Sequence, residues 1–121
     1  MSLNSESSGP ARVMDLAPLA GDVGGMANAL AVLDGFLGSV EAWLPEMEAA
    51  AEAGNWDEAR RIAHGIKGSA RTFHARRVEA AAQQAEERAH ARDARAFALA
   101  LQDVRACYEE LLAARPSEGA A

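Results

Sequence analysis

The most constraining feature of the sequence is a set of apolar residues that recur at alternating steps of four and three positions. This spacing places their side chains along one stripe of a helix of about seven turns. Phe36 and Trp43 widen the stripe, so we expect the helix to be buried along much of its length. Pro45 should kink this helix, and Gly54 should end it. The recurring residues are Met26, Leu30, Leu33, Leu37, Val40, Leu44 and Met47.

Three more long helices are expected after this one. Residues 55–58 form a capping box, in which the Asn and the Glu each satisfy an orphan amide, so a helix should run from there to about residue 72 or 73. Another helix is expected at about residues 75–91. The last should begin at Asp93 as its N-cap and stop before Pro116.

A short helical element is also expected at residues 15–20, before Gly21 and the candidate N-cap Asp22. Composition agrees with an all-helical chain, because 30 of the 121 residues are alanine while β-branched and aromatic residues are scarce. Helices joined by short connections pack most simply as an antiparallel bundle. The sequence therefore predicts an all-α antiparallel four-helix bundle with a short extra N-terminal helix.

The chain is long enough for one domain. Residues 1–14 are polar and rich in serine, which predicts a disordered leader before a bundle at residues 15–115 and a disordered tail at 116–121. No apolar run approaches the roughly 20 residues that span a bilayer, and the N-terminus lacks the features of a signal peptide. We therefore expect a soluble, cytoplasmic protein. The single Cys107 excludes an internal disulfide and agrees with a reducing compartment.

Charge is unevenly distributed along the chain. Eighteen acidic side chains against twelve basic ones give a net charge of −6, which argues against a general nucleic-acid binder. Residues 1–57 hold nine acids and one base, whereas residues 60–77 hold six bases and no acid. A solvated helix face usually has acids interspersed among its bases. This local charge of +6 inside an acidic chain therefore indicates a function.

The helix expected at residues 56–73 presents one histidine on its polar face. On a wheel of about 100° per residue, His64 lies nearly opposite the centre of the apolar arc. Gly65 and Gly68 lie inside the helix, where each costs about 1 kcal/mol relative to alanine. Gly68 is one turn from His64, so its missing side chain leaves room for a partner. The residues within roughly 60° of His64 on the wheel are Asp57, Arg60, Arg61, Lys67, Gly68 and Arg71.

These cations suit a histidine that accepts and returns a phosphoryl group. We expect Lys67, Arg60 and Arg71 to disfavour the imidazolium form by like-charge repulsion, which would keep His64 neutral and nucleophilic. The same cations would attract a phosphoryl group, because its three anionic oxygens pair well with ammonium and guanidinium donors.

Residues 63–87, AHGIKGSARTFHARRVEAAAQQAEE, resemble the signature of histidine-containing phosphotransfer (HPt) domains, in which Lys-Gly follows a histidine by three and four residues. The likeness in layout covers about residues 15–114. His74 stands where the family commonly has glycine in the turn between the third and fourth helices, so it would have to adopt a left-handed conformation or reshape the turn. The matching positions are His64, Lys67, Gly68, Ser69 and Ala70, then the apolar Phe73 and Val78 and the acidic Glu86.

The resemblance implies that His64 takes a phosphoryl group from an aspartate of one receiver domain and yields it to another, with no kinase or ATPase activity in this chain. Lys67 and Arg71 would screen charge, and Gly68 would admit the partner. No cofactor or metal is expected here, because Mg²⁺ would be bound by the receiver. The expected partners are response-regulator receivers and a hybrid sensor histidine kinase, with no nucleic acid or membrane, and the chain would be a monomer. Supporting, partner-binding roles would fall to Arg60, Arg61, Ser69 and Arg71.

Two alternatives remain open at this point. The chain could be an interaction module that binds a receiver or a helix without transferring phosphate, or the phosphoacceptor domain of a chemotaxis-type kinase. A metal site is disfavoured, because His64, His74 and His90 have no ligand spacing on a shared helix and lie among cations.

Overall fold

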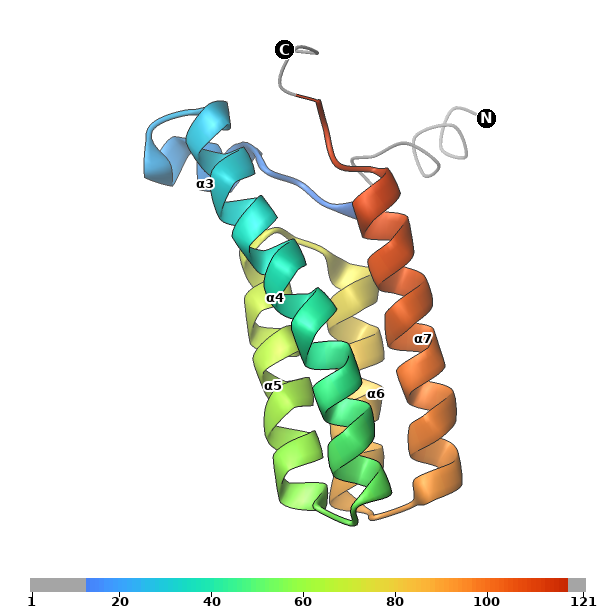
Figure 1. The fold of residues 1–121 in the computed structure, drawn as a ribbon. Helices are drawn as coiled ribbons and strands as arrows, with labels where there is room; N and C mark the ends of the chain where they lie inside the picture. The colour runs from blue at the N-terminus through green and yellow to red at the C-terminus, as the bar shows by residue number, and fades with distance from the viewer. Residues whose placement is uncertain (1–12, 118–121) are drawn as a thin grey trace, which may run out of the picture.

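The computed structural model of the chain describes residues 13–117, and every regular element in that range is a helix. Four long helices lie side by side and run alternately up and down, with a short helix at one end (Figure 1). The prediction of an all-α antiparallel bundle with a short N-terminal helix is confirmed. In chain order the helices are α3 (Ala17–Val23), α4 (Met26–Glu52), α5 (Trp56–Thr72), α6 (Arg76–His90) and α7 (Ala94–Ala113).

The short helix α3 ends at a left-handed glycine. Gly24 has a φ of 89°, and Gly25, with a φ of 129°, precedes the first residue of α4. Gly21 and Asp22 lie inside α3, so the N-cap expected at Asp22 is wrong: the chain turns where glycine permits it. Within residues 13–117 no single helix is long and apolar enough to cross a membrane, and α3 and α4 pass that test only together, across a bend of 109°.

Residue 14, one position before the expected boundary at residue 15, already packs in the core. Met14 and Leu16 are buried, and the Asp15 N–H donates to the carbonyl oxygen of Phe73 at the end of α5, at 2.9 Å. These contacts close the end of the bundle where α5 turns into α6. Most of the expected leader, residues 1–12, and residues 118–121 of the expected tail lie outside the described residues.

Helix α4 carries the long apolar stripe. It continues as one helix through Pro45 and ends at Glu52. Met26, at the first position, is exposed, whereas the other six residues of the stripe are buried. Phe36 beside the stripe stacks on Phe73, with ring centroids 5.0 Å apart. This contact joins α4 to the end of α5.

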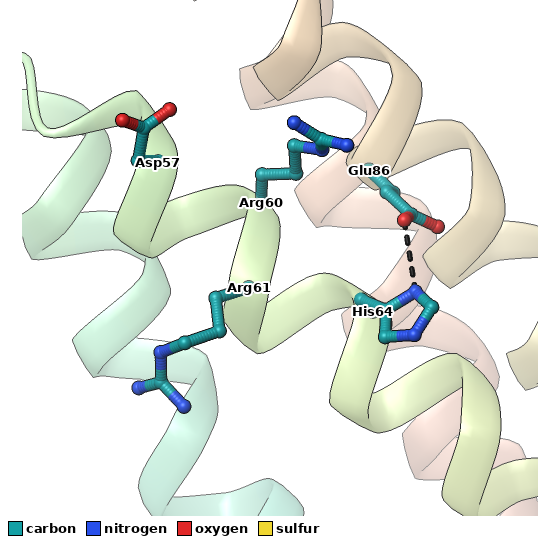
Figure 2. A pocket seen from close by; sticks show the side chains of 5 residues that line it. All are labelled: Asp57, Arg60, Arg61, His64 and Glu86. Carbon is teal, nitrogen blue, oxygen red and sulfur yellow. Dashed lines mark hydrogen bonds and ion pairs between the residues drawn. The ribbon is translucent and has the colours of Figure 1, made fainter.

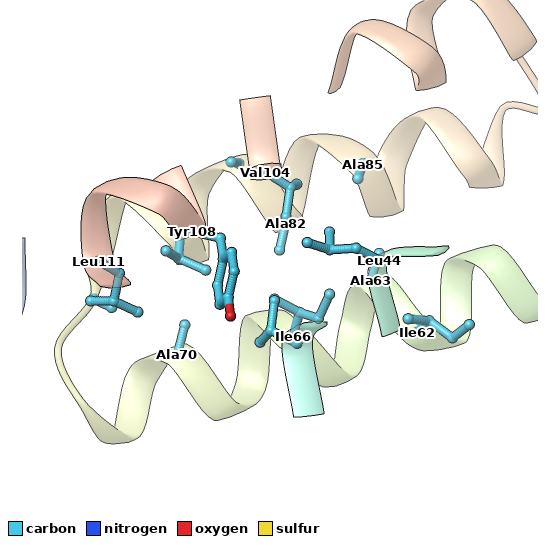
Figure 3. Packing of buried hydrophobic residues seen from close by; sticks show 14 of the residues in the cluster. Leu44, Ile62, Ala63, Ile66, Ala70, Ala82, Ala85, Val104, Tyr108 and Leu111 are labelled. Carbon is cyan, nitrogen blue, oxygen red and sulfur yellow. The ribbon is translucent and has the colours of Figure 1, made fainter. Parts of the chain in front are cut away.

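Helices α5 and α6 share the most extensive interface in the bundle. Its inner positions are mostly alanine, as the spacing of residues 78–89 predicts, and small side chains let two helix backbones approach closely. Figure 3 shows Ala63, Ala70, Ala82 and Ala85 in this core, together with the ring of Tyr108.

Caps and turns set the helix starts. The Asn55 side chain accepts the N–H of Glu58 at 3.3 Å, and the Asp93 side chain accepts that of Ala96 at 3.0 Å. The reciprocal half of the expected capping box is not formed, because the Glu58 carboxylate pairs with Arg61 instead. In the turn between α5 and α6, His74 has a φ of 52°, so of the two expected possibilities the chain adopts the left-handed conformation.

Candidate functional site

His64 stands on the outer face of α5. The apolar residues at positions 59, 62, 63, 66 and 70 form one buried stripe, so a side chain opposite them must face solvent. The imidazole is 66% exposed. The outward position expected from the helical wheel is confirmed.

A carboxylate from the next helix contacts the imidazole. Glu86 on α6 places Oε2 2.9 Å from Nδ1 of His64 and Oε1 2.6 Å from Nζ of Lys67 (Figure 2 shows the contact with His64). Lys67 also donates to Oε1 of Gln83 at 2.9 Å. Its side chain is only 13% exposed, and that of Glu86 16%. One carboxylate thus ties the imidazole to the ammonium group one turn further along α5.

The charge state of Glu86 sets the tautomer of His64. Burial by itself would raise the pKa of Glu86, but hydrogen bonds from Lys67 and His64 outweigh it and leave that pKa below its ordinary value of 4.5. An ionised carboxylate can only accept a hydrogen bond, so Nδ1 of His64 carries the proton. In the neutral imidazole, Nε2 is then the ring nitrogen that holds the lone pair.

The expected ring of unopposed cations is not what the structure contains. Of the six bases in residues 60–77, four pair with carboxylates. One of these carboxylates lies at the start of α5, two lie on α6 and one lies on α7. The direct partner of His64 is thus an anion, and of the three cations expected to act on it Lys67 and Arg71 are paired, whereas Arg60 has no ion pair among residues 13–117. The charge count over residues 60–77 did not indicate this, because the partner acids lie just outside that segment or further along, on α6 and α7. The pairs are Arg61 with Glu58, Lys67 with Glu86, Arg71 with Glu79 and Arg77 with Glu110.

An open cavity of about 370 Å³ lies in front of the imidazole. Residues from the first half of α5 and one residue of α6 line it, so the helix pair itself forms the hollow. The lining residues are Asp57, Arg60, Arg61, His64 and Glu86 (Figure 2).

Gly65 and Gly68 leave part of α5 uncovered beside His64. A Cβ atom built at either position would meet nothing within 4 Å. The packing of the described chain therefore does not require glycine at these positions. Because these two positions carry no side chain, nothing projects from them beside the imidazole.

Ser69 lies apart from the cavity around His64. It lines a groove of about 240 Å³ between α4 and α5, which also contains Val32, Phe36, Ser39, Trp43, Thr72 and Phe73. Arg71 lies further along α5, where its Nε donates to Glu79. The structure thus brings Arg60 and Arg61 to the His64 cavity and places Ser69 and Arg71 outside it.

Sequence reasoning missed two features of the site. Glu86 was noted only as an acidic position of the family motif, and Gln83 was not noted. Both lie one turn apart on the same side of α6, which is the pattern that could have drawn attention to them. Among residues 13–117, no three histidine, cysteine or acidic side chains gather closely enough to hold a metal ion.

Fold and site together define a helical bundle that displays an exposed histidine, paired with a carboxylate, on the outer face of a helix. A family model described as the Hpt domain matches residues 31–114, which is more than half of the chain. The chain therefore belongs to the Hpt domain family. The match begins inside α4, covers α5, α6 and α7 completely, and leaves α3 outside. No curated protein and no solved structure matches the chain.

Family membership establishes the general function. Hpt domains carry phosphoryl groups on histidine in the phosphorelays of two-component signalling, they interact with receiver domains, and they are carriers rather than kinases.

Proposed function

We propose that this chain accepts a phosphoryl group on His64 from an aspartate of one receiver domain and passes it to an aspartate of another. The observation that carries the proposal is the contact between Glu86 and Nδ1 of an exposed imidazole. This contact holds the ring in one orientation and leaves Nε2 open to solvent.

The transfer step follows from that geometry. The Nε2 lone pair attacks the phosphorus of the aspartyl phosphate, the N–P bond forms, and the bond from phosphorus to the aspartate oxygen breaks. The aspartate leaves as a carboxylate with the bonding electron pair. The imidazole keeps its Nδ1 proton and becomes positively charged, and the neighbouring carboxylate of Glu86 offsets that charge. The reverse step uses the same groups.

The remaining site residues act through charge and position. Lys67 shares Glu86 with His64, so it holds that carboxylate ionised and in place. Arg60, Arg61 and Arg71 add positive charge to the face that meets the acidic pocket of a receiver. The open surface at Gly68 allows the partner backbone to come close to the imidazole.

The groove between α4 and α5 extends the docking surface. It lies on the α4 side of α5 and mixes apolar side chains such as Val32 and Trp43 with the hydroxyl group of Ser69. A receiver that covers the Gly65 and Gly68 surface would reach this groove, and partial burial of its apolar side chains would add affinity.

The wider setting is part of the proposal. A hybrid sensor histidine kinase supplies the phosphoryl group through its receiver domain, Mg²⁺ is bound by the receivers, and the chain works as a cytoplasmic monomer.

Replacing the phosphoacceptor tests the assignment. Purified chain and its His64→Gln variant are incubated with phosphorylated receiver domains, and acid-labile label on the chain is measured. We expect label on the wild type and none on His64→Gln, with His90→Gln as the control because His90 is also an exposed histidine on a helix. Circular dichroism should show that both variants stay folded.

Two results would contradict the proposal. Label that persists on His64→Gln would place the phosphoacceptor elsewhere. Binding to the receivers without any transfer to the wild type would indicate the interaction module instead.

A further inference from the structure

The cations on the His64 face differ in whether they already form an ion pair with a carboxylate. Arg61, Lys67 and Arg71 are each held by a carboxylate, and Lys67 is largely buried as well. Arg60 forms no ion pair within residues 13–117. A cation without a partner anion keeps its full charge and all its donors for an incoming group.

Arg60 also has the right placement. It lies four residues before His64 on α5, and side chains at this spacing are neighbours on a helix. Both residues line the same cavity. In Figure 2 the guanidinium of Arg60 extends to the side of α5 where His64 meets Glu86, whereas Arg61 points to the opposite side. Neither Asp57 nor Glu86, the two carboxylates of the cavity, forms an ion pair with Arg60.

We propose that Arg60 is the residue that binds the phosphoryl oxygens when His64 is phosphorylated, an inference that rests on the function proposed above. Lys67 is already held by Glu86 and Gln83 at 2.6 and 2.9 Å, which leaves at most one of its three donors, and its side chain is largely buried. Arg60 has no such competitor. Its planar guanidinium can also donate to two phosphoryl oxygens at once, which a lysine ammonium does less well.

Phosphoramidate tests this role without a partner protein. Phosphoramidate reacts as its zwitterion, whose nitrogen already carries the extra proton. Nε2 of His64 attacks the phosphorus, the N–P bond to the imidazole forms, and the original P–N bond breaks with its electron pair going to nitrogen, which leaves as neutral ammonia. We compare the initial rate of labelling of the wild type, Arg60→Gln, Arg60→Lys and Arg76→Gln. Arg76 is the matched control, because it is an exposed base of the same basic segment, forms no ion pair among the described residues and does not line the cavity.

We expect Arg60→Gln to be labelled about three- to tenfold more slowly than the wild type, as for the loss of a charge-assisted contact at an accessible site. Arg60→Lys should recover part of the rate, and Arg76→Gln should match the wild type. In a ³¹P NMR titration, Arg60→Gln should move the second ionisation of the phosphoryl group to higher pH, because a nearby cation favours the dianion.

Each other result overturns the inference. Wild-type labelling of Arg60→Gln would show that Arg60 does not bind the phosphoryl group, and equal slowing of Arg60→Gln and Arg76→Gln would reduce its effect to net charge. If the wild type takes no label, or if its label persists in His64→Gln, the phosphotransfer assignment fails as well.

Discussion

At the scale of single residues, Glu86 decides the chemistry of the site. Its two oxygens contact Nδ1 of His64 and Nζ of Lys67, and the carboxylate is mostly buried between α5 and α6. A neutral imidazole that donates from Nδ1 keeps the lone pair of Nε2 for the nucleophilic role that we propose. A neutral amide at this position would keep the shape of the side chain but remove its charge.

We expect Glu86→Gln to lower the free energy of unfolding at pH 7 by about 1 to 3 kcal/mol, because Lys67 loses its charged partner. The pKa of Glu86 is lowered in the folded state from its ordinary value of 4.5. The stabilisation is therefore complete above about pH 4.5 and is lost as the pH falls through the folded-state pKa. Urea denaturation of both proteins at pH 7, 5 and 3 should show the difference shrinking toward acid.

Glu87→Gln is the control for that experiment. Glu87 neighbours Glu86 on α6 and accepts a hydrogen bond from Gln83, but it does not contact His64 or Lys67. A difference in stability between wild type and Glu86→Gln that stays constant from pH 7 to pH 3 would contradict the role given to the Glu86 charge.

At the scale of elements, α5 combines a buried face rich in alanine with an outer face on which glycine leaves a position without a side chain. Ala59, Ala63 and Ala70 are fully buried, and their small side chains allow the close packing that brings α6 within reach of His64. On the outer face, Gly68 has open space around its Cα. A glycine inside a helix costs stability without improving packing here, so we attribute it to partner access.

We expect Gly68→Ala to raise the free energy of unfolding by about 0.5 to 1 kcal/mol, because alanine favours the helix and its Cβ meets no atom. Gly68→Leu should reduce phosphotransfer from a receiver domain at least tenfold while leaving labelling by phosphoramidate nearly unchanged, because only the large donor needs the open surface. Equal effects on the large and the small donor would argue against a docking role for Gly68.

At the scale of the whole molecule, ion pairs link the acidic first half of the chain to basic residues further along it. Glu48 on α4 pairs with Arg105 on α7, and Asp34 on α4 pairs with Arg115 just beyond α7. A buried hydrogen bond reinforces this contact, from the hydroxyl of Tyr108 to the carbonyl oxygen of Leu37 at 3.1 Å. Helix α7 and the residue just beyond it are therefore held to α4 by contacts that involve neither α5 nor α6.

We expect Tyr108→Phe to destabilise the bundle by about 1 kcal/mol, because a buried hydrogen bond is lost while the ring volume is kept. Phosphoramidate labelling of His64 should not change. Thermal or urea unfolding measures the first effect and the labelling rate the second. Unchanged stability would mean that water or a local shift replaces the hydroxyl contact.

Much of the fold could be predicted from the sequence. The four-and-three spacing along α4, the Asn55 and Asp93 caps and the inner faces of α5 to α7 are local patterns, and local patterns determine where helices lie and which side they bury. The left-handed conformation of His74 was one of two possibilities that the family resemblance implied, and the structure selected it. The end of α3 was missed, because either Gly21 or Gly24 could have stopped it and only the path of the chain selects one.

The sequence by itself determined that His64 faces outward on a helix among basic residues, because helical periodicity depends only on neighbours along the chain. Only the tertiary structure decided what those groups contact. Packing α6 against α5 brings Glu86 to His64 across 22 positions and Gln83 to Lys67 across 16. The register and rotation of the two helices set these contacts, and the same packing engages Lys67 and Arg71 with carboxylates of α6 while it leaves Arg60 facing the cavity.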